Sequence, residues 1–251
     1  MKLLFKITGL FAVLILTGCS STTELAGVDS KKASAANAEL GVAYLSRGNY
    51  EVAMNKLKKA LSYDDDNADA HHYIAELYRR LEQNDLANEH FKEAIDLNEE
   101  DSSVKNNYGI FLCGIEKYKE GLALFNQVLL DPLYSDKGKA YENMGLCTQK
   151  QGNLKKSEQY FISALKFNAN LPGALLGMAQ LAFDQGKIDT ASTYLNRHNK
   201  ISRHSPQSLW LGVLIERKKG RSGRSGSYAV LLKGRFPDSK EAKWLKKLKI
   251  R

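Results

Sequence analysis

The sequence predicts an all-α protein, a right-handed superhelical solenoid built from about six pairs of antiparallel helices. Two observations predict this fold: small residues recur at nearly constant intervals, and large apolar residues recur at a fixed distance after them. With 251 residues, 43% hydrophobic and 26% charged, the chain can bury a core. The composition excludes disordered and collagen-like chains, and three cysteines exclude a disulfide-rich scaffold.

The first eighteen residues predict a lipoprotein signal peptide. Lys2 and Lys6 precede an apolar run, 7–16, that is too short to span a bilayer, which needs roughly 20 residues. Leu16-Thr17-Gly18-Cys19 then resembles a bacterial lipobox, which implies cleavage before Cys19 and acylation of its thiol and new amino group. The alternative is an ordinary signal peptide with a chance cysteine. Serine rather than aspartate at position 20 implies the periplasmic face of the outer membrane, with the chain anchored in its lipid through acylated Cys19.

Residues 19–33 are small and polar with no apolar period, which predicts a lipidated flexible tether. Two or more acyl chains would hold such a tether firmly, since each buried methylene contributes about 0.8 kcal/mol.

The rest of the chain, 34–251, repeats. Its small residues are separated by 34, 34, 36, 34 and 33 positions, and each of the first five is followed twelve residues later by another small residue and sixteen residues later by Leu or Phe. Small residues mark where two helices cross closely, and the large ones fill the space beside the crossing. This period is that of the tetratricopeptide repeat, a pair of antiparallel helices. The marker residues are Gly41, Ala75, Gly109, Gly145, Ala179 and Gly212.

The spacing places the repeats near 34–67, 68–101, 102–137, 138–171, 172–204 and 205–238, followed by a basic C-terminal helix. Gly48, Asn84 and Gly152 lie between paired helices, where a left-handed residue can end the first helix. The sixth repeat is atypical, because glycines at 220, 223 and 226 predict either a long loop or a frayed helix start.

The net charge of +9 lies at the C-terminal end. Residues 217–251 hold 13 basic and 2 acidic residues, whereas 19–216 hold 22 basic and 26 acidic ones. With a secretion signal, nucleic acid is not an expected partner. Either the tail contacts anionic outer-membrane lipid or an acidic protein surface, or it is the solvated face of a last amphipathic helix over 239–250, with Trp244, Leu245 and Leu248 on its apolar side.

No enzyme is indicated. The sequence lacks zinc-protease, phosphate-loop, dinucleotide and serine-hydrolase motifs. His71 and His72 are adjacent, so on a helix they diverge and cannot chelate one metal ion together. We therefore expect no catalytic residue, no cofactor, no metal and no small-molecule substrate.

Cys113 and Cys147 are 34 residues apart, at nearly equivalent places on the first helices of the third and fourth repeats. Adjacent first helices pack side by side, and the periplasm is oxidising, so a disulfide is favoured. Two buried free thiols are the alternative.

The first helices of a solenoid line its concave side, which predicts a partner-binding groove. In the first repeat the positions expected to face this groove are apolar: Ala35, Ala38, Val42 and Leu45. In the second repeat they are polar: Asp69, His72, Glu76 and Arg79. An apolar groove can dock a partner's helix or strand. The alternative is that the chain's own tether or a neighbouring helix covers it.

A lipobox followed by six such repeats resembles the PilF/PilW family of type IV pilus lipoproteins. The likeness covers essentially the whole chain, and four stretches carry it most specifically: 108–113, 131–134, 142–147 and 235–242. The resemblance implies a pilotin that binds subunits of the pilus secretin and promotes their localisation to the outer membrane and their multimerisation. The alternative is a scaffold lipoprotein of another envelope machine, such as β-barrel assembly or a peptidoglycan-enzyme adaptor.

Overall fold

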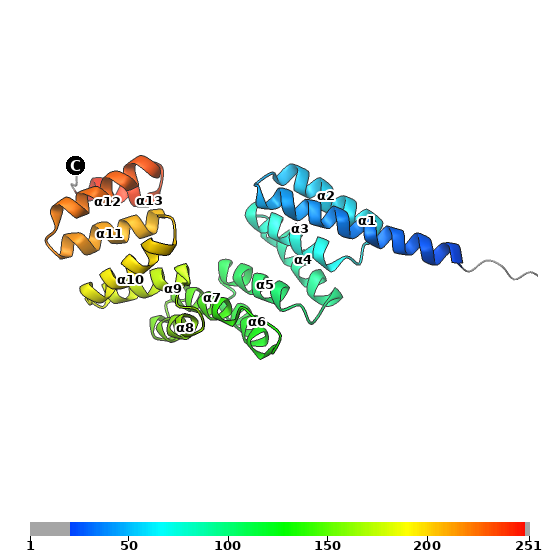
Figure 1. The fold of residues 1–251 in the computed structure, drawn as a ribbon, viewed down its shortest axis with the longest axis horizontal. Coiled ribbons are helices and arrows are strands. Elements are labelled where there is room, and N and C mark those ends of the chain that lie inside the picture. The colour runs from blue at the N-terminus through cyan, green and yellow to red at the C-terminus, as the bar shows by residue number, and fades with distance from the viewer. Residues whose placement is uncertain (1–20, 249–251) are drawn as a thin grey trace, which may run out of the picture. The chain divides into compact units, whose positions relative to one another are not determined.

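The computed structural model of the chain describes the backbone of residues 21–248, with side chains from residue 29 onward. The predicted signal peptide and Cys19 lie outside the described residues. Within them the chain forms thirteen α-helices and no strand, which confirms the all-α prediction (Figure 1). No described helix is both long enough and apolar enough to cross a membrane. The helices are α1 (Ser21–Ser46), α2 (Tyr50–Tyr63), α3 (Ala68–Arg80), α4 (Asn84–Leu97), α5 (Ser102–Gly114), α6 (Tyr118–Leu130), α7 (Lys137–Lys150), α8 (Leu154–Phe167), α9 (Pro172–Asp184), α10 (Ile188–Ile201), α11 (Pro206–Lys218), α12 (Ser222–Arg235) and α13 (Lys240–Lys247).

The chain divides inside α3, between Tyr73 and Ile74, into two compact units, which are described separately. In the first unit α1 packs against α2. In the second unit α5 packs against α6, α7 against α8, α9 against α10 and α11 against α12, as antiparallel pairs (Figure 1). Apart from the early start of α1, each pair falls within one predicted repeat to within one residue.

The predicted crossings of small and large residues are present. A Cβ added to Gly41 would lie 2.5 Å from the Leu57 side chain, and one added to Gly145 would lie 2.4 Å from the Phe161 ring. Gly109 has the same relation to Phe125, at 2.8 Å. Each large residue follows its glycine by sixteen positions, as the sequence predicts, so the two helices of a repeat can approach only because the glycine has no side chain.

The turns between paired helices use a left-handed residue. Gly48 and Gly152 have φ of 76° and 85°, as predicted. Between α3 and α4 the left-handed residue is Glu82, with φ of 59°, and not Asn84, which begins α4. The prediction for Asn84 was wrong because the left-handed conformation is required at the position just after the helix end. In this turn that position is occupied by Glu82.

The prediction of a flexible tether is corrected for residues 21–33, because they belong to α1, whereas residues 19 and 20 lie outside the described residues. The packed part of α1 holds the helix on α2: the buried Ser34 hydroxyl donates a hydrogen bond to the Ala60 carbonyl at 2.9 Å, and the Ser30 hydroxyl donates to the Tyr63 carbonyl. Once a helix is nucleated, each further turn costs little, so it extends toward the N-terminus through residues without an apolar period.

The glycine-rich stretch of the sixth repeat is helical. Gly220 takes the left-handed turn position with φ of 71°, and α12 then begins at Ser222. The buried Ser225 hydroxyl donates to the Val213 carbonyl of α11 at 3.2 Å, which fixes the start of the helix despite its glycines. The last helix, α13, begins after Ser239, whose side chain accepts a hydrogen bond from the Ala242 N–H.

Candidate functional site

The predicted groove on the first repeat corresponds to a cavity of about 270 Å³ in the first unit. Val42, which was expected to form the apolar floor together with Leu45, lines this cavity, and so does Ala38, on the face of α1 that is turned toward the start of α3. Six residues form this first-repeat cavity: Ala35, Ala38, Glu39, Val42, Asp69 and Tyr73.

The chemistry of the first-repeat cavity is mixed. Its floor is aliphatic, Tyr73 adds the half-buried face of a phenol ring, and the exposed carboxylates of Glu39 and Asp69 make its rim acidic. An apolar side chain can enter such a cavity, and a neighbouring cationic side chain would be attracted to the rim. The cavity therefore favours a segment that carries an apolar residue beside a lysine or arginine.

Leu45 does not belong to the cavity, which corrects its assignment to the groove. It is 3% exposed and lies in the core. Ser34, Ala38, Gly41 and Leu45 are all buried and follow one another at helical spacing, so they form the stripe of α1 that packs inward. Leu45 lies on that stripe, whereas Val42 lies at its edge and is partly exposed.

His72 is also corrected, because it is only 4% exposed and its ring stacks on that of Tyr73 at 4.6 Å. Glu76 and Arg79 lie beyond the boundary, in the second unit. There the Arg79 guanidinium donates to the Glu76 carboxylate at 2.8 Å, and Arg79 lines a different cavity, of about 340 Å³. The positions of the first two repeats that were predicted to line one groove therefore do not all line one cavity.

Glu39 and Tyr73 were missed by the sequence reasoning. Glu39 precedes Val42 by three residues, and Tyr73 follows Asp69 by four. The same helical spacing that selected Val42 and Asp69 places these two beside them. Both residues lie within one helical turn of a predicted position, Glu39 of Val42 and Tyr73 of Asp69, so a search one turn to either side would have found them.

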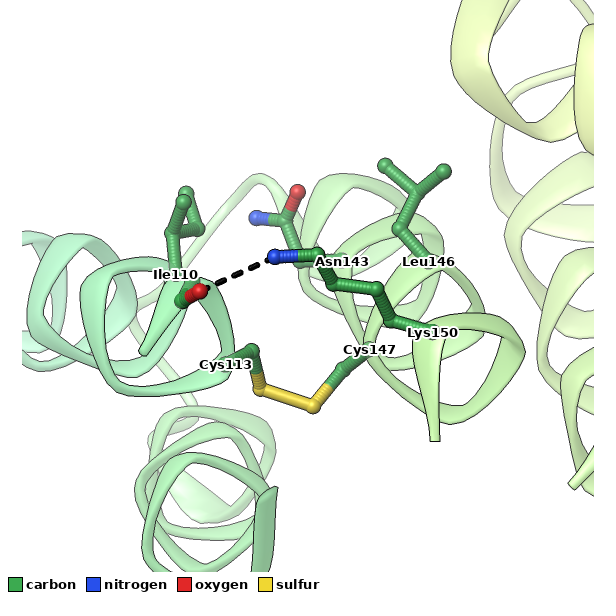
Figure 2. Close-up of a pocket in the computed structure, with 7 residues that line it drawn as sticks. Ile110, Cys113, Asn143, Leu146, Cys147 and Lys150 are labelled. Atoms are coloured by element: carbon green, nitrogen blue, oxygen red, sulfur yellow. Dashed lines mark hydrogen bonds between the residues drawn. A yellow bond between two sulfur atoms is a disulfide. The ribbon is translucent and has the colours of Figure 1, made fainter. Parts of the chain in front are cut away.

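The structure joins Cys113 of α5 to Cys147 of α7 in a disulfide, with the two Cα atoms 5.4 Å apart. Both residues are buried, and the bridge borders a pocket of about 220 Å³ (Figure 2). The Lys150 ammonium donates to the Gly114 carbonyl at 2.9 Å across the pocket, a second link between α5 and α7. Ile110 and Leu146 supply its apolar wall. The disulfide thus ties the first helices of two successive repeats.

The marker residues Gly109 and Gly145 are 36 positions apart, two more than the usual 34. The two extra residues lie in the loop between α6 and α7, residues 131–136. Asp131 organises this loop: the Ser102 hydroxyl donates to its carboxylate at 2.6 Å, and the Leu133 N–H donates at 2.8 Å. These hydrogen bonds, with that of Ser102 the strongest influence, hold the pKa of Asp131 below its usual value.

Replacing Ser102 with alanine is expected to raise the pKa of Asp131 toward its ordinary value, because the hydroxyl stabilises the ionised carboxylate. The pKa of Asp131 is lower in the folded chain than in the unfolded chain, so its ionised carboxylate stabilises the fold at pH values above the ordinary pKa. This stabilisation is lost as the pH falls through the pKa of the folded state. A carboxyl-carbon NMR titration measures the shift. Ser135→Ala, an exposed change in the same loop, is the control, and an unchanged Asp131 pKa in Ser102→Ala would contradict the assignment.

Within the described residues, no group of three or more His, Cys, Asp or Glu side chains is arranged to hold a metal ion. Tetratricopeptide scaffolds are typically non-enzymatic, and the cavities described above are suited to contact with a protein partner.

Comparison with known proteins agrees with this architecture. Models of the tetratricopeptide repeat match residues 41–82, 68–101 and 137–171. The crystal structure of a tetratricopeptide repeat protein from Parabacteroides merdae has the same fold, with a TM-score of 0.69 at 19% identity over 87% of this chain and 84% of that one.

The type IV pilus assembly protein PilF of Pseudomonas aeruginosa is 30% identical over 230 residues, which are 90% of this chain and 91% of PilF. A solved structure of P. aeruginosa PilF covers 88% of this chain and all of that one, with a TM-score of 0.75 and 29% identity. The structure of PilW, described as a widely conserved type IV pilus biogenesis factor, covers 85% of this chain and 98% of that one, with a TM-score of 0.74 and 29% identity. The chain therefore belongs to the PilF/PilW family of tetratricopeptide repeat proteins of type IV pilus biogenesis.

Proposed function

We propose that this chain is an outer-membrane lipoprotein of the pilotin type, which binds subunits of the type IV pilus secretin and promotes their localisation and multimerisation. Family membership supports a role in pilus biogenesis. The lipobox at residues 16–19 supports an anchor formed by acyl chains on Cys19, on the periplasmic face of the outer membrane. A subunit held by the repeats would travel to the membrane with its lipidated carrier.

The observation that carries the binding role is the first-repeat cavity. It offers an aliphatic floor with an acidic rim, so it can take an apolar side chain while Glu39 and Asp69 attract a neighbouring cation. A short amphipathic secretin segment with an apolar anchor and a basic neighbour has this chemistry. In this proposal the repeats bind the secretin subunit, and the acylated Cys19 directs the complex to the outer membrane.

The role as a whole is tested in a strain that lacks this chain. Membrane fractions are separated and probed for heat-resistant secretin multimers, with wild-type and Cys19→Ala complementation alongside. Deletion is expected to abolish the multimers, and Cys19→Ala is expected to leave the secretin out of the outer membrane. Normal multimers in the outer membrane of the deletion strain would overturn the proposal.

Val42→Glu is expected to weaken secretin binding at least tenfold, because it places a carboxylate on the apolar floor beside two existing ones. Binding of the purified secretin is measured by titration, and circular dichroism checks the fold. Val52→Glu is the matched control: it is the same substitution at a half-buried valine of the same helix pair, outside the cavity. Equal binding by the Val42→Glu and wild-type chains would exclude this cavity as the secretin site.

The alternative of a scaffold for another envelope machine is not favoured, because PilF and PilW, the proteins of about 30% identity described above, are named for type IV pilus assembly and biogenesis.

A further inference from the structure

The last described helix, α13, has one apolar and one cationic face. Ala242 and Leu245 are 6% and 0% exposed and pack against α11 and α12 in the last hydrophobic cluster of the second unit. The opposite face, called here the α13 face, is formed by residues at helical spacings of three, four and seven. These residues are Lys240, Lys243, Trp244 and Lys247.

Trp244 is fixed at the edge of this face. Its ring lies 5.4 Å from that of Trp210, centroid to centroid, and Trp210 is a partly buried residue that packs against the last hydrophobic cluster. The side chain is nevertheless 37% exposed, and the Lys240 ammonium lies 5.8 Å from its centroid. An ordered tryptophan with one buried part and one exposed part, surrounded by lysines, is the arrangement that proteins place at a membrane–water interface.

The charge around the α13 face is almost entirely positive. Residues 217–251 carry 13 basic and 2 acidic side chains, and one of the two acids, Glu241, is only 3% exposed. Among the described residues, no carboxylate lies within ion-pair distance of Lys243 or Lys247. The field of this face is therefore not neutralised by neighbouring groups of the chain.

We propose that the α13 face docks on the surface of an anionic lipid bilayer, with the lysines on lipid phosphates and the Trp244 ring at the level of the headgroups. Lysines are flexible point charges, and an anionic lipid surface attracts lysines that lie close to it. All cations of the face are lysines. Each lysine near such a surface strengthens binding about fivefold at moderate salt.

The test uses the full chain with Cys19→Ala, so that no acyl anchor contributes and every variant has the same N-terminus. Binding is measured by co-sedimentation with vesicles of phosphatidylglycerol and phosphatidylcholine, and with vesicles of phosphatidylcholine alone. Lys240→Gln, Lys243→Gln and Lys247→Gln together are expected to weaken the binding that depends on anionic lipid on the order of 100-fold. The matched control replaces Lys155, Lys156 and Lys166, three exposed lysines of α8, with glutamine, which removes the same charge elsewhere.

A second readout reports from the site itself. The chain has two tryptophans, so Trp210→Phe leaves Trp244 as the single emitter. Anionic vesicles are expected to shift its emission to shorter wavelength. Adding 0.5 M salt is expected to reverse the shift, because the Debye screening length is then only about 4 Å. Equal binding to neutral vesicles, or an equal loss in the α8 control, would overturn the proposal. Tighter binding of soluble polyglutamate than of anionic vesicles would overturn it in favour of an acidic protein partner.

Discussion

Phe161→Ala is expected to lower the free energy of unfolding by about 3–5 kcal/mol, the range measured when a buried phenylalanine is truncated. The ring is 0% exposed and lies in a cluster with Leu171, Met178 and Leu181. It enters the space left by two glycines on different helices: a Cβ added to Gly145 of α7 or to Gly177 of α9 would lie 2.4 Å from the ring. Helices α7, α8 and α9 therefore meet on this one side chain, and truncation leaves a cavity that rigid helices cannot close.

The reciprocal change tests the same contact from the other side. Gly145→Ala is expected to cost about 1–3 kcal/mol through overpacking against the Phe161 ring. Gly226→Ala is the matched control, because it lies in a helix with no heavy atom within 4 Å of the added Cβ. It is expected to stabilise by about 0.5–1 kcal/mol. Urea unfolding followed by circular dichroism measures all three variants, and a loss below 1 kcal/mol for Phe161→Ala would contradict the assigned role of the ring.

The repeat register could be predicted from the sequence because it depends on contacts at fixed short separations. Gly41 meets Leu57, and Gly145 meets Phe161, each at sixteen residues, inside one helix pair. Such contacts leave a period in the sequence whatever the rest of the chain does. The same is true of the helix ends at Gly48 and Gly152, where a backbone with positive φ favours glycine.

The orientation of individual side chains could not be predicted equally well. Leu45 and His72 were placed on the groove face by counting positions from the marker residues Gly41 and Ala75, yet both are buried. A position near the edge of a buried stripe changes side with a small rotation of its helix, and that rotation is set by the neighbouring helix, not by local sequence. Val42 and Ala38 both line the cavity, although Ala38 is as buried as Leu45, at 3% exposed.

The helical N-terminal part of α1 shows a second limit. Residues 21–33 lack an apolar period, and periodicity reports only on helices that bury one face along their length. The packed part of α1, held on α2 through Ser34, supplies the nucleus from which the helix extends. The sequence pattern of residues 21–33 therefore does not indicate that these residues continue a helix whose later part packs on α2.

Removing the Cys113–Cys147 bridge is expected to lower the free energy of unfolding by about 3–4 kcal/mol, because it closes a loop of 34 residues in the unfolded chain. In a solenoid each repeat contacts only its neighbours. The disulfide therefore adds a covalent bond between the third and fourth repeats, which are otherwise held together by packing and by hydrogen bonds between α5 and α7. Mass spectrometry of the isolated protein, with and without alkylation, is expected to find these two thiols protected.

The covalent link can be separated from the packing of the two sulfur atoms. A Cβ added to Gly121 would lie 2.7 Å from the Cys113 sulfur, so α6 packs against the bridge as well. Protein unfolded and refolded in reductant keeps both sulfurs but loses the bond, whereas Cys113→Ala with Cys147→Ala loses both. Comparing the two in urea, on a Cys19→Ala background, assigns the first loss to the link and the further loss to packing. If refolding in reductant left the unfolding midpoint and slope unchanged, the bridge would contribute nothing to stability. The junction of α5 and α7 would then depend on packing and on the Lys150–Gly114 and Asn143–Asn106 hydrogen bonds.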